Sequence, residues 1–232
     1  EALMQRVAEG YRKVRNTFRF VLGNLNGFDP ARDAVPFAEM EPIDRYLLLR
    51  AAEVTARTRQ WYEEFAFHKV YHQVHDFCIV DLSAFYFDVL KDRLYTFAPR
   101  SRARRSAQTA IWRIGEALVR LLAPMMSFTS EEIWGHLPQT AGRPASVHLA
   151  LFPAEEELVE SSVPAAEREA LRAEWQILLG ARDQVLLALE SARNAKTIGG
   201  GLEAQVTLAA PGGVHAVLER HARELCALFI VS

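Results

Sequence analysis

Helical periodicity is the feature that most constrains the fold, because it runs through about the first 140 residues without any strand pattern. Residues 2–25 show it clearly. Their apolar side chains recur at spacings of three and four residues, which places on one side of a helix Tyr11, Val14, Phe18, Val21, Leu22 and Leu25. The same periodicity predicts further helices over residues 42–65, 67–80, 84–95 and 101–123. We therefore expect a helical bundle.

Local signals predict where two of these helices are interrupted or begin. The segment 81–83 (D-L-S) is expected to break or cap the helical pattern between residues 67 and 95. A capping-box pattern joins Thr129 and Glu132, and it predicts that the next helix has Thr129 as its N-cap.

The pattern changes after residue 145, where short alternating segments appear. They predict strands over residues 146–152, 202–208 and 227–231. Helices are expected between these strands, over residues 163–193 and 214–225. Strands that alternate with helices are typical of a small α/β module. The predicted fold class is thus mainly α: a helical bundle in domain 1–145, followed by a small α/β module in domain 146–232.

The overall charge excludes a polycation. Half of the 232 residues are apolar and the formal net charge is −2, so nucleic-acid binding would need a local basic patch. Cys78 and Cys226 form no disulfide framework, which suits a reducing compartment. No apolar run reaches the roughly 18 residues of a transmembrane helix, and no signal peptide is expected. Because the sequence begins inside a helical pattern without Met, we expect a piece of a longer protein.

Arginines without acidic neighbours mark the polar side of the first helix. Arg12, Arg15 and Arg19 share one face there with Asn16, and no acid lies between them. Like charges at this spacing repel one another. Either acids of neighbouring helices pair with them or a polyanion does, and the helix alone leaves both alternatives open.

A second basic face follows on the segment 101–123. Its members on this segment are Arg102, Arg105, Arg113 and Arg120, and Lys91 and Arg93 lie shortly before it. Cations at a helix N-terminus oppose the helix dipole and so destabilise the helix. Their presence there indicates that they serve an interaction outside the helix. Arginine binds phosphate in a bidentate manner. Two basic faces in an otherwise acidic protein therefore predict a local nucleic-acid patch.

Histidines on the segment 67–80 suggest a metal site at first sight. His68, His72, His75 and Cys78 fall along one side of that helix. However, one straight helix presents about two adjacent ligands to a tetrahedral ion. Histidines that hydrogen-bond to packed neighbours are the simpler interpretation, so no metal site is predicted. The carboxylates form no acid–base pair and no nucleophile motif is present, so no catalytic residue is predicted either.

Five stretches resemble the isoleucyl-tRNA synthetase family, in the same order along the chain. They are Y-R-K-V-R-N-T-F-R-F-V-L-G-N-L-N-G-F-D-P (11–30), D-L-S-A-F-Y-F-D-V-L-K-D-R-L-Y (81–95), L-L-A-P-M-M-S-F-T-S-E-E-I-W (121–134), S-V-H-L (146–149) and R-N-A-K-T-I-G-G-G-L-E-A-Q-V-T-L (193–208). The resemblance covers nearly the whole chain. The valyl-tRNA synthetases are similar in the bundle and in the motif at 121–134, but they depart elsewhere, so they are the alternative.

The resemblance implies the anticodon-binding domain of a class I synthetase. The parent enzyme would be an isoleucine–tRNA ligase that uses ATP and Mg²⁺ and acts on tRNA(Ile), as a cytoplasmic monomer. The family's catalytic motifs, H-I-G-H and K-M-S-K-S, are absent here, so this piece would bind no cofactor. The zinc knuckle of some bacterial members would lie outside it. By helical face and resemblance, the expected tRNA-binding residues are Arg12, Arg15, Asn16, Arg19, Lys91, Arg93, Arg102 and Arg105.

Two other functions stay open from the residues alone. A helical scaffold domain would pair its arginines with acidic partner proteins. A metal-dependent enzyme would use His68, His72 and His75. Asn16 carries both a donor and an acceptor, so it can serve either a base edge or a neighbouring helix.

Overall fold

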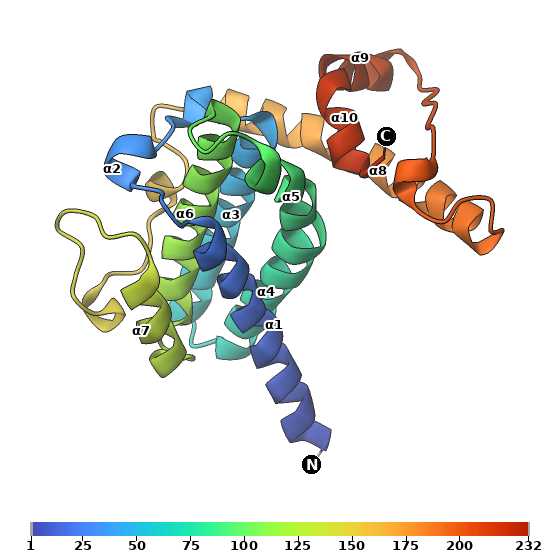
Figure 1. Ribbon diagram of the computed structural model, residues 1–232. Coiled ribbons are helices and arrows are strands. Elements are labelled where there is room, and N and C mark those ends of the chain that lie inside the picture. The colour runs from blue at the N-terminus through green and yellow to red at the C-terminus, as the bar shows by residue number, and fades with distance from the viewer. Residues whose placement is uncertain (1, 232) are drawn as a thin grey trace. The chain divides into compact units, whose positions relative to one another are not determined.

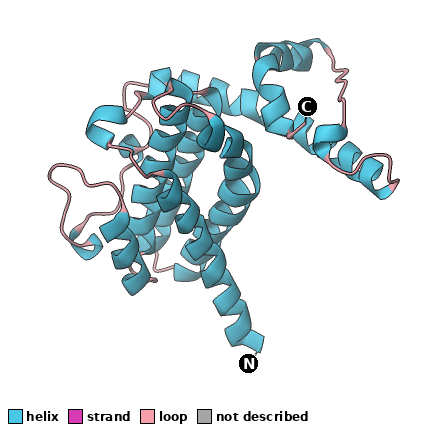
Figure 2. Cartoon of the chain, in the orientation of Figure 1, coloured by secondary structure: helices cyan, strands magenta, loops and turns pink. Residues whose placement is uncertain are grey.

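All regular structure in the described chain is helical. The computed structural model describes residues 2–231, and none of these residues lies in a β-strand (Figure 2). Contacts group the chain into two units, Glu1–Val163 and Pro164–Ser232. In the first unit the helices pack side by side (Figure 1). The prediction of a mainly α fold with a helical bundle is thereby confirmed.

Three long helices form the centre of the first unit. They are α1 (Ala2–Asn24), α3 (Pro42–Glu63) and α6 (Arg102–Leu122). Their apolar faces form a core in which Phe18, Leu47 and Ile114 are all buried. Burying such a side chain contributes roughly 1.5–3 kcal/mol. Gly115 lets α1 and α6 approach closely, because a Cβ at this position would lie 3.0 Å from Val21 Cγ1.

Shorter elements complete the bundle: α2 (Pro30–Asp33), η1 (Phe37–Glu39) and α7 (Ser127–His136). The predicted N-cap at Thr129 is wrong, because α7 already begins at Ser127 and Met126 is its N-cap. The amide of Met126 bonds back to the Leu122 carbonyl, so the chain turns directly into α7. Thr129 therefore lies within the first turn of α7 rather than before it. Its hydroxyl hydrogen-bonds Tyr11 Oη at 3.1 Å.

The helical pattern over residues 67–96 continues without a break. Three elements follow one another directly: α4 (Phe67–Asp76), the π-helical segment η2 (Phe77–Tyr86) and α5 (Phe87–Thr96). The expected break at residues 81–83 is therefore wrong. Side-chain hydroxyls support the widened turns of η2: the Cys78 carbonyl accepts from Ser83 Oγ at 2.7 Å and from Thr17 Oγ1 at 3.3 Å.

Residues 146–163 do not form the predicted strand at 146–152. They contain only two short helical turns, η3 (Val147–Leu149) and η4 (Glu155–Glu157). The Glu131 carboxylate accepts from Ser146 Oγ and from the Val147 amide, so these groups bond to α7 rather than to a strand. The strand prediction is wrong because a ladder needs a partner strand. Contacts group residues 146–163 with the first unit, while the domain boundary after residue 145 stays a prediction.

The second unit is helical as well. Its elements are α8 (Ala165–Asn194), η5 (Gly201–Glu203), α9 (Gly212–Arg220) and α10 (Ala222–Phe229). The predicted strand at 227–231 is wrong because residues 227–229 form the end of α10, where Leu228 and Phe229 are buried, and Ile230 ends the helix in a left-handed conformation. The predicted strand at 202–208 is also wrong, since no other described segment pairs with its backbone. Helices and an irregular segment thus replace the small α/β module.

Candidate nucleic-acid interface

The first basic face lies exposed on α1. We call its four residues the α1 arginine face: Arg12, Arg15, Asn16 and Arg19. All four are exposed, and none of their side chains forms a hydrogen bond or an ion pair with any residue in the part of the chain that the structure describes. Of the two alternatives that the sequence leaves open, pairing with acids of neighbouring helices therefore does not occur within residues 2–231.

A shallow hollow of about 80 Å³ lies beside this face, between α1 and α7. We call it the α1–α7 groove. Its lining residues come from the two helices in equal number: Arg15, Phe18, Arg19 and Leu22 from α1, and Thr129, Glu132, Ile133 and His136 from α7. The groove thus combines apolar side chains with cationic and acidic ones.

Sequence reasoning placed no member of α7 in the interface. The signal was nonetheless present, because Thr129, Glu132 and His136 recur at spacings of three and four residues. That spacing places polar side chains on one face of a helix. What the spacing could not indicate is that this face of α7 lies against the arginines of α1.

The second basic face, on α6, has intramolecular partners throughout. Arg102 lies 3.3 Å from the Glu39 carboxylate, and its guanidinium also donates to the Glu39 carbonyl. Arg113 lies 3.6 Å from Glu160 Oε1. Arg120 forms an ion pair of 2.6 Å with Glu157. These acids come from η1 and from the segment 146–163, so the α6 arginines attach connecting segments to the bundle.

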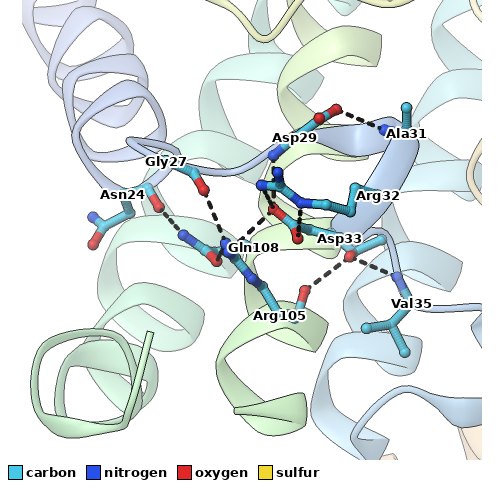
Figure 3. Close-up of polar contacts among 10 residues, drawn as sticks. Asn24, Gly27, Asp29, Ala31, Arg32, Asp33, Val35, Arg105 and Gln108 are labelled. Atoms are coloured by element: carbon cyan, nitrogen blue, oxygen red, sulfur yellow. Dashed lines mark hydrogen bonds and ion pairs between the residues drawn. The ribbon is translucent and has the colours of Figure 1, made fainter. Parts of the chain in front are cut away.

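Arg105 joins α6 to the turn that follows α1 and to α2 (Figure 3). Its guanidinium lies 3.1 Å from Asp33 Oδ2 and donates to Gln108 Oε1 at 2.8 Å and to the Gly27 carbonyl at 3.3 Å. Only 12% of the Arg105 side chain is exposed. Hydrogen bonds from the Arg32 side chain and from the backbone of Asp29 lower the pKa of Asp33 to about 2. Arg105 therefore faces a permanently ionised carboxylate at neutral pH.

Arg93 is bound to a buried acid. Its Nη2 lies 2.6 Å from Asp44 Oδ1, and Asp44 is fully buried. The Tyr86 hydroxyl donates to Asp44 Oδ1 at 2.7 Å, and Ser106 Oγ donates to Asp44 Oδ2. Burial raises the pKa of Tyr86 well above its ordinary value, so its phenol stays a donor. This cluster joins α3, η2, α5 and α6, and its carboxylate neutralises the charge of Arg93.

Two of the predicted tRNA-binding residues, Lys91 and Arg102, have an ion-pair partner but remain exposed. Lys91 forms an exposed ion pair of 2.6 Å with Asp88, one turn before it on α5. Its side chain is 58% exposed, and that of Arg102 is 62% exposed. Exposed pairs of this kind contribute about 0.2–1 kcal/mol. Either cation can therefore exchange its partner for a phosphate at small cost.

The histidines of α4 do not gather into a metal centre. His75 Nδ1 lies 3.4 Å from Asp76, and its ring lies 5.5 Å from that of Tyr71. Cys78 is fully buried, and this burial raises the pKa of its thiol to about 12. Among residues 2–231, no group of three or more His, Cys, Asp or Glu is placed to hold a metal ion. None of the described helices is long and apolar enough to cross a membrane.

Comparisons with known proteins agree with this geometry. The family model "Anticodon-binding domain of tRNA ligase" matches residues 44–208. A protein of Symbiobacterium thermophilum named isoleucine–tRNA ligase is 45% identical over the whole chain, and one of Syntrophotalea carbinolica with the same name is 46% identical over 99% of it. The isoleucine–tRNA ligase of Haemophilus influenzae is 45% identical over the whole chain. The chain spans 24% of the length of each relative. It therefore belongs to the anticodon-binding domain family of tRNA ligases.

Proposed function

We propose that this chain recognises the anticodon region of tRNA(Ile) as part of an isoleucine–tRNA ligase. The observation that carries the proposal is the contrast between the two basic faces. On α6, Arg105, Arg113 and Arg120 are paired with acids of the same unit. By contrast, Arg12, Arg15 and Arg19 have no acidic partner in the described chain. Unneutralised arginines on one helix face are the electrostatic signature of a phosphate-binding surface.

The chemistry of the α1 arginine face suits an RNA loop. Arginine contacts phosphate oxygens and also stacks on unstacked bases, while the amide of Asn16 offers a donor and an acceptor to a base edge. Lys91 and Arg102 would add phosphate contacts at the periphery, because both are exposed. Arg93 and Arg105 would act indirectly, since their guanidinium groups hold the bundle together.

The activity of the parent protein is inferred from the names of the relatives. Activation of isoleucine with ATP and Mg²⁺, and its transfer to tRNA, would take place in the parts of the polypeptide outside this chain. The parent would be a cytoplasmic monomer. This chain would contribute the choice of tRNA, which is a binding function and requires no catalytic side chain of its own.

The salt dependence of tRNA binding tests the proposal. The affinity of the chain for tRNA(Ile) is measured by fluorescence anisotropy over a series of salt concentrations. Each phosphate contact contributes close to one unit to the slope of log affinity against log salt, so Arg15→Ala is expected to reduce the slope by about 1. Arg57→Ala on α3 is the matched control, because Arg57 is also exposed and has no partner among the described residues.

Three results would contradict the proposal. The first is an affinity that does not change with salt. The second is an equal affinity for an unrelated tRNA. The third is that Arg12→Ala, Arg15→Ala and Arg19→Ala all give the same salt slope as Arg57→Ala.

A further inference from the structure

The α1–α7 groove carries an unsatisfied acid beside unsatisfied cations. Glu132 is exposed, and its carboxylate has no hydrogen bond or ion pair with another described residue. Arg15 and Arg19 line the same groove, yet neither guanidinium forms an ion pair with the Glu132 carboxylate. The groove therefore offers donors from one wall and a free carboxylate from the other.

This combination does not suit a phosphate. A carboxylate at the site would repel the negative charge that the arginines attract. The group that satisfies both walls must present hydrogen-bond acceptors to an arginine and N–H donors to the carboxylate. The bases of an RNA loop present both kinds of group on their edges.

Guanine fits this arrangement better than the other bases. Its O6 and N7 are the acceptors that arginine binds in a bidentate manner. Its N1–H and N2 amino groups are two neighbouring donors, which match the two oxygens of a carboxylate. Adenine and cytosine each offer one amino group on the pairing edge, and uracil offers one N–H. Among the four bases, guanine alone presents two adjacent donors together with the arginine-binding acceptors.

We propose that Glu132 is a specificity-determining residue that selects an unstacked guanine in the α1–α7 groove. The inference rests on the proposed function, because it assumes that the α1 arginine face binds RNA. Glu132 accepts from N1–H and the N2 amino group, and Arg19, which lines the same groove, donates to O6 and N7, while Arg15 keeps the phosphate contact of the proposed function. Phe18 is buried, so the base face stacks on a guanidinium rather than on this ring.

Chemically modified loops test the role of Glu132. The probes are RNA hairpins with a seven-nucleotide loop that holds one guanine, which is replaced by inosine or by adenine. Inosine keeps N1–H and O6 but lacks the N2 amino group. Wild-type chain is expected to bind the guanine hairpin about 5- to 100-fold more tightly than either replacement. The ratio of the guanine affinity to the inosine affinity is the guanine preference, because inosine lacks only the N2 amino group that donates to Glu132, whereas adenine also lacks the O6 that accepts from arginine.

Glu132→Gln is expected to bring the guanine preference close to one, because an amide has a single oxygen and adds competing donors. It should leave the salt slope unchanged, because no cation is removed. Glu63→Gln is the control, since Glu63 is an exposed glutamate on α3 that also lacks a partner in the described chain. Its guanine preference should equal that of the wild type.

The outcomes separate this inference from the proposed function. If Glu132→Gln keeps the wild-type guanine preference, or if the wild type shows none, the inference is overturned. The proposed function then still holds as long as Arg15→Ala lowers the salt slope. If the wild-type chain binds none of the RNAs, both are overturned together.

Discussion

Replacing Asp44 with alanine is expected to destabilise the bundle by about 3–5 kcal/mol. Asp44 is 0% exposed and accepts hydrogen bonds from Arg93, Tyr86 and Ser106. The substitution removes all three contacts at once. It also leaves the Arg93 guanidinium, whose side chain is only 13% exposed, without the carboxylate that it is bonded to. Against a total stability of about 5–15 kcal/mol, this is a large fraction.

Urea unfolding followed by circular dichroism measures the effect. With an m-value of about 2–3 kcal/mol/M, the midpoint should fall by roughly 1–2.5 M. Asp88→Ala is the control, because Asp88 pairs with Lys91 at the surface and its loss should cost less than about 1 kcal/mol. The double variant Asp44→Ala, Arg93→Met should lose less than the sum of the single changes, since it removes the unpaired charge.

Two results would refute this reasoning. One is an Asp44→Ala variant whose free energy of unfolding lies within about 1 kcal/mol of the wild type, below the range for a broken buried pair. The other is an Arg93→Met variant that lowers the salt slope of tRNA binding while its stability is unchanged. That result would show that Arg93 contacts RNA rather than stabilising the bundle.

Two further predictions concern titration and thiol chemistry. The pKa of Asp33 is lowered to about 2 in the folded chain, below its ordinary value of 3.8, so its contribution to stability is present above about pH 4 and is lost as the pH falls toward 2. Urea midpoints measured from pH 5 to pH 2 should therefore fall less in Asp33→Asn than in the wild type, and parallel curves would contradict the assignment. In a thiol titration at pH 8, exposed Cys226 should react in the native chain, while buried Cys78, with a pKa of about 12, should react only after unfolding. Equal rates for both thiols in the native state would show that η2 opens.

The helices were predictable because their signal is local. The apolar side chains of α1, α3 and α6 recur every three or four residues, and each helix forms wherever that stripe can be buried. The strands at 146–152, 202–208 and 227–231 were predicted from alternation, which is also local, but a strand is stable only when another strand pairs with it. Within residues 2–231 no such partner is present, and the segments adopt turns, an irregular path and a helix instead.

The sequence by itself determined that the chain is a helical bundle and that two helices carry arginine faces. It could not determine which face is neutralised, because a helical periodicity places charges on a face without indicating what lies opposite. The acids that pair with the α6 arginines stand far from them in sequence, with Asp33 and Glu39 before α6 and Glu157 and Glu160 after it. Only the tertiary structure brought these acids to α6 and left the arginines of α1 without them, because ion pairing depends on distance in space and not on spacing along the chain.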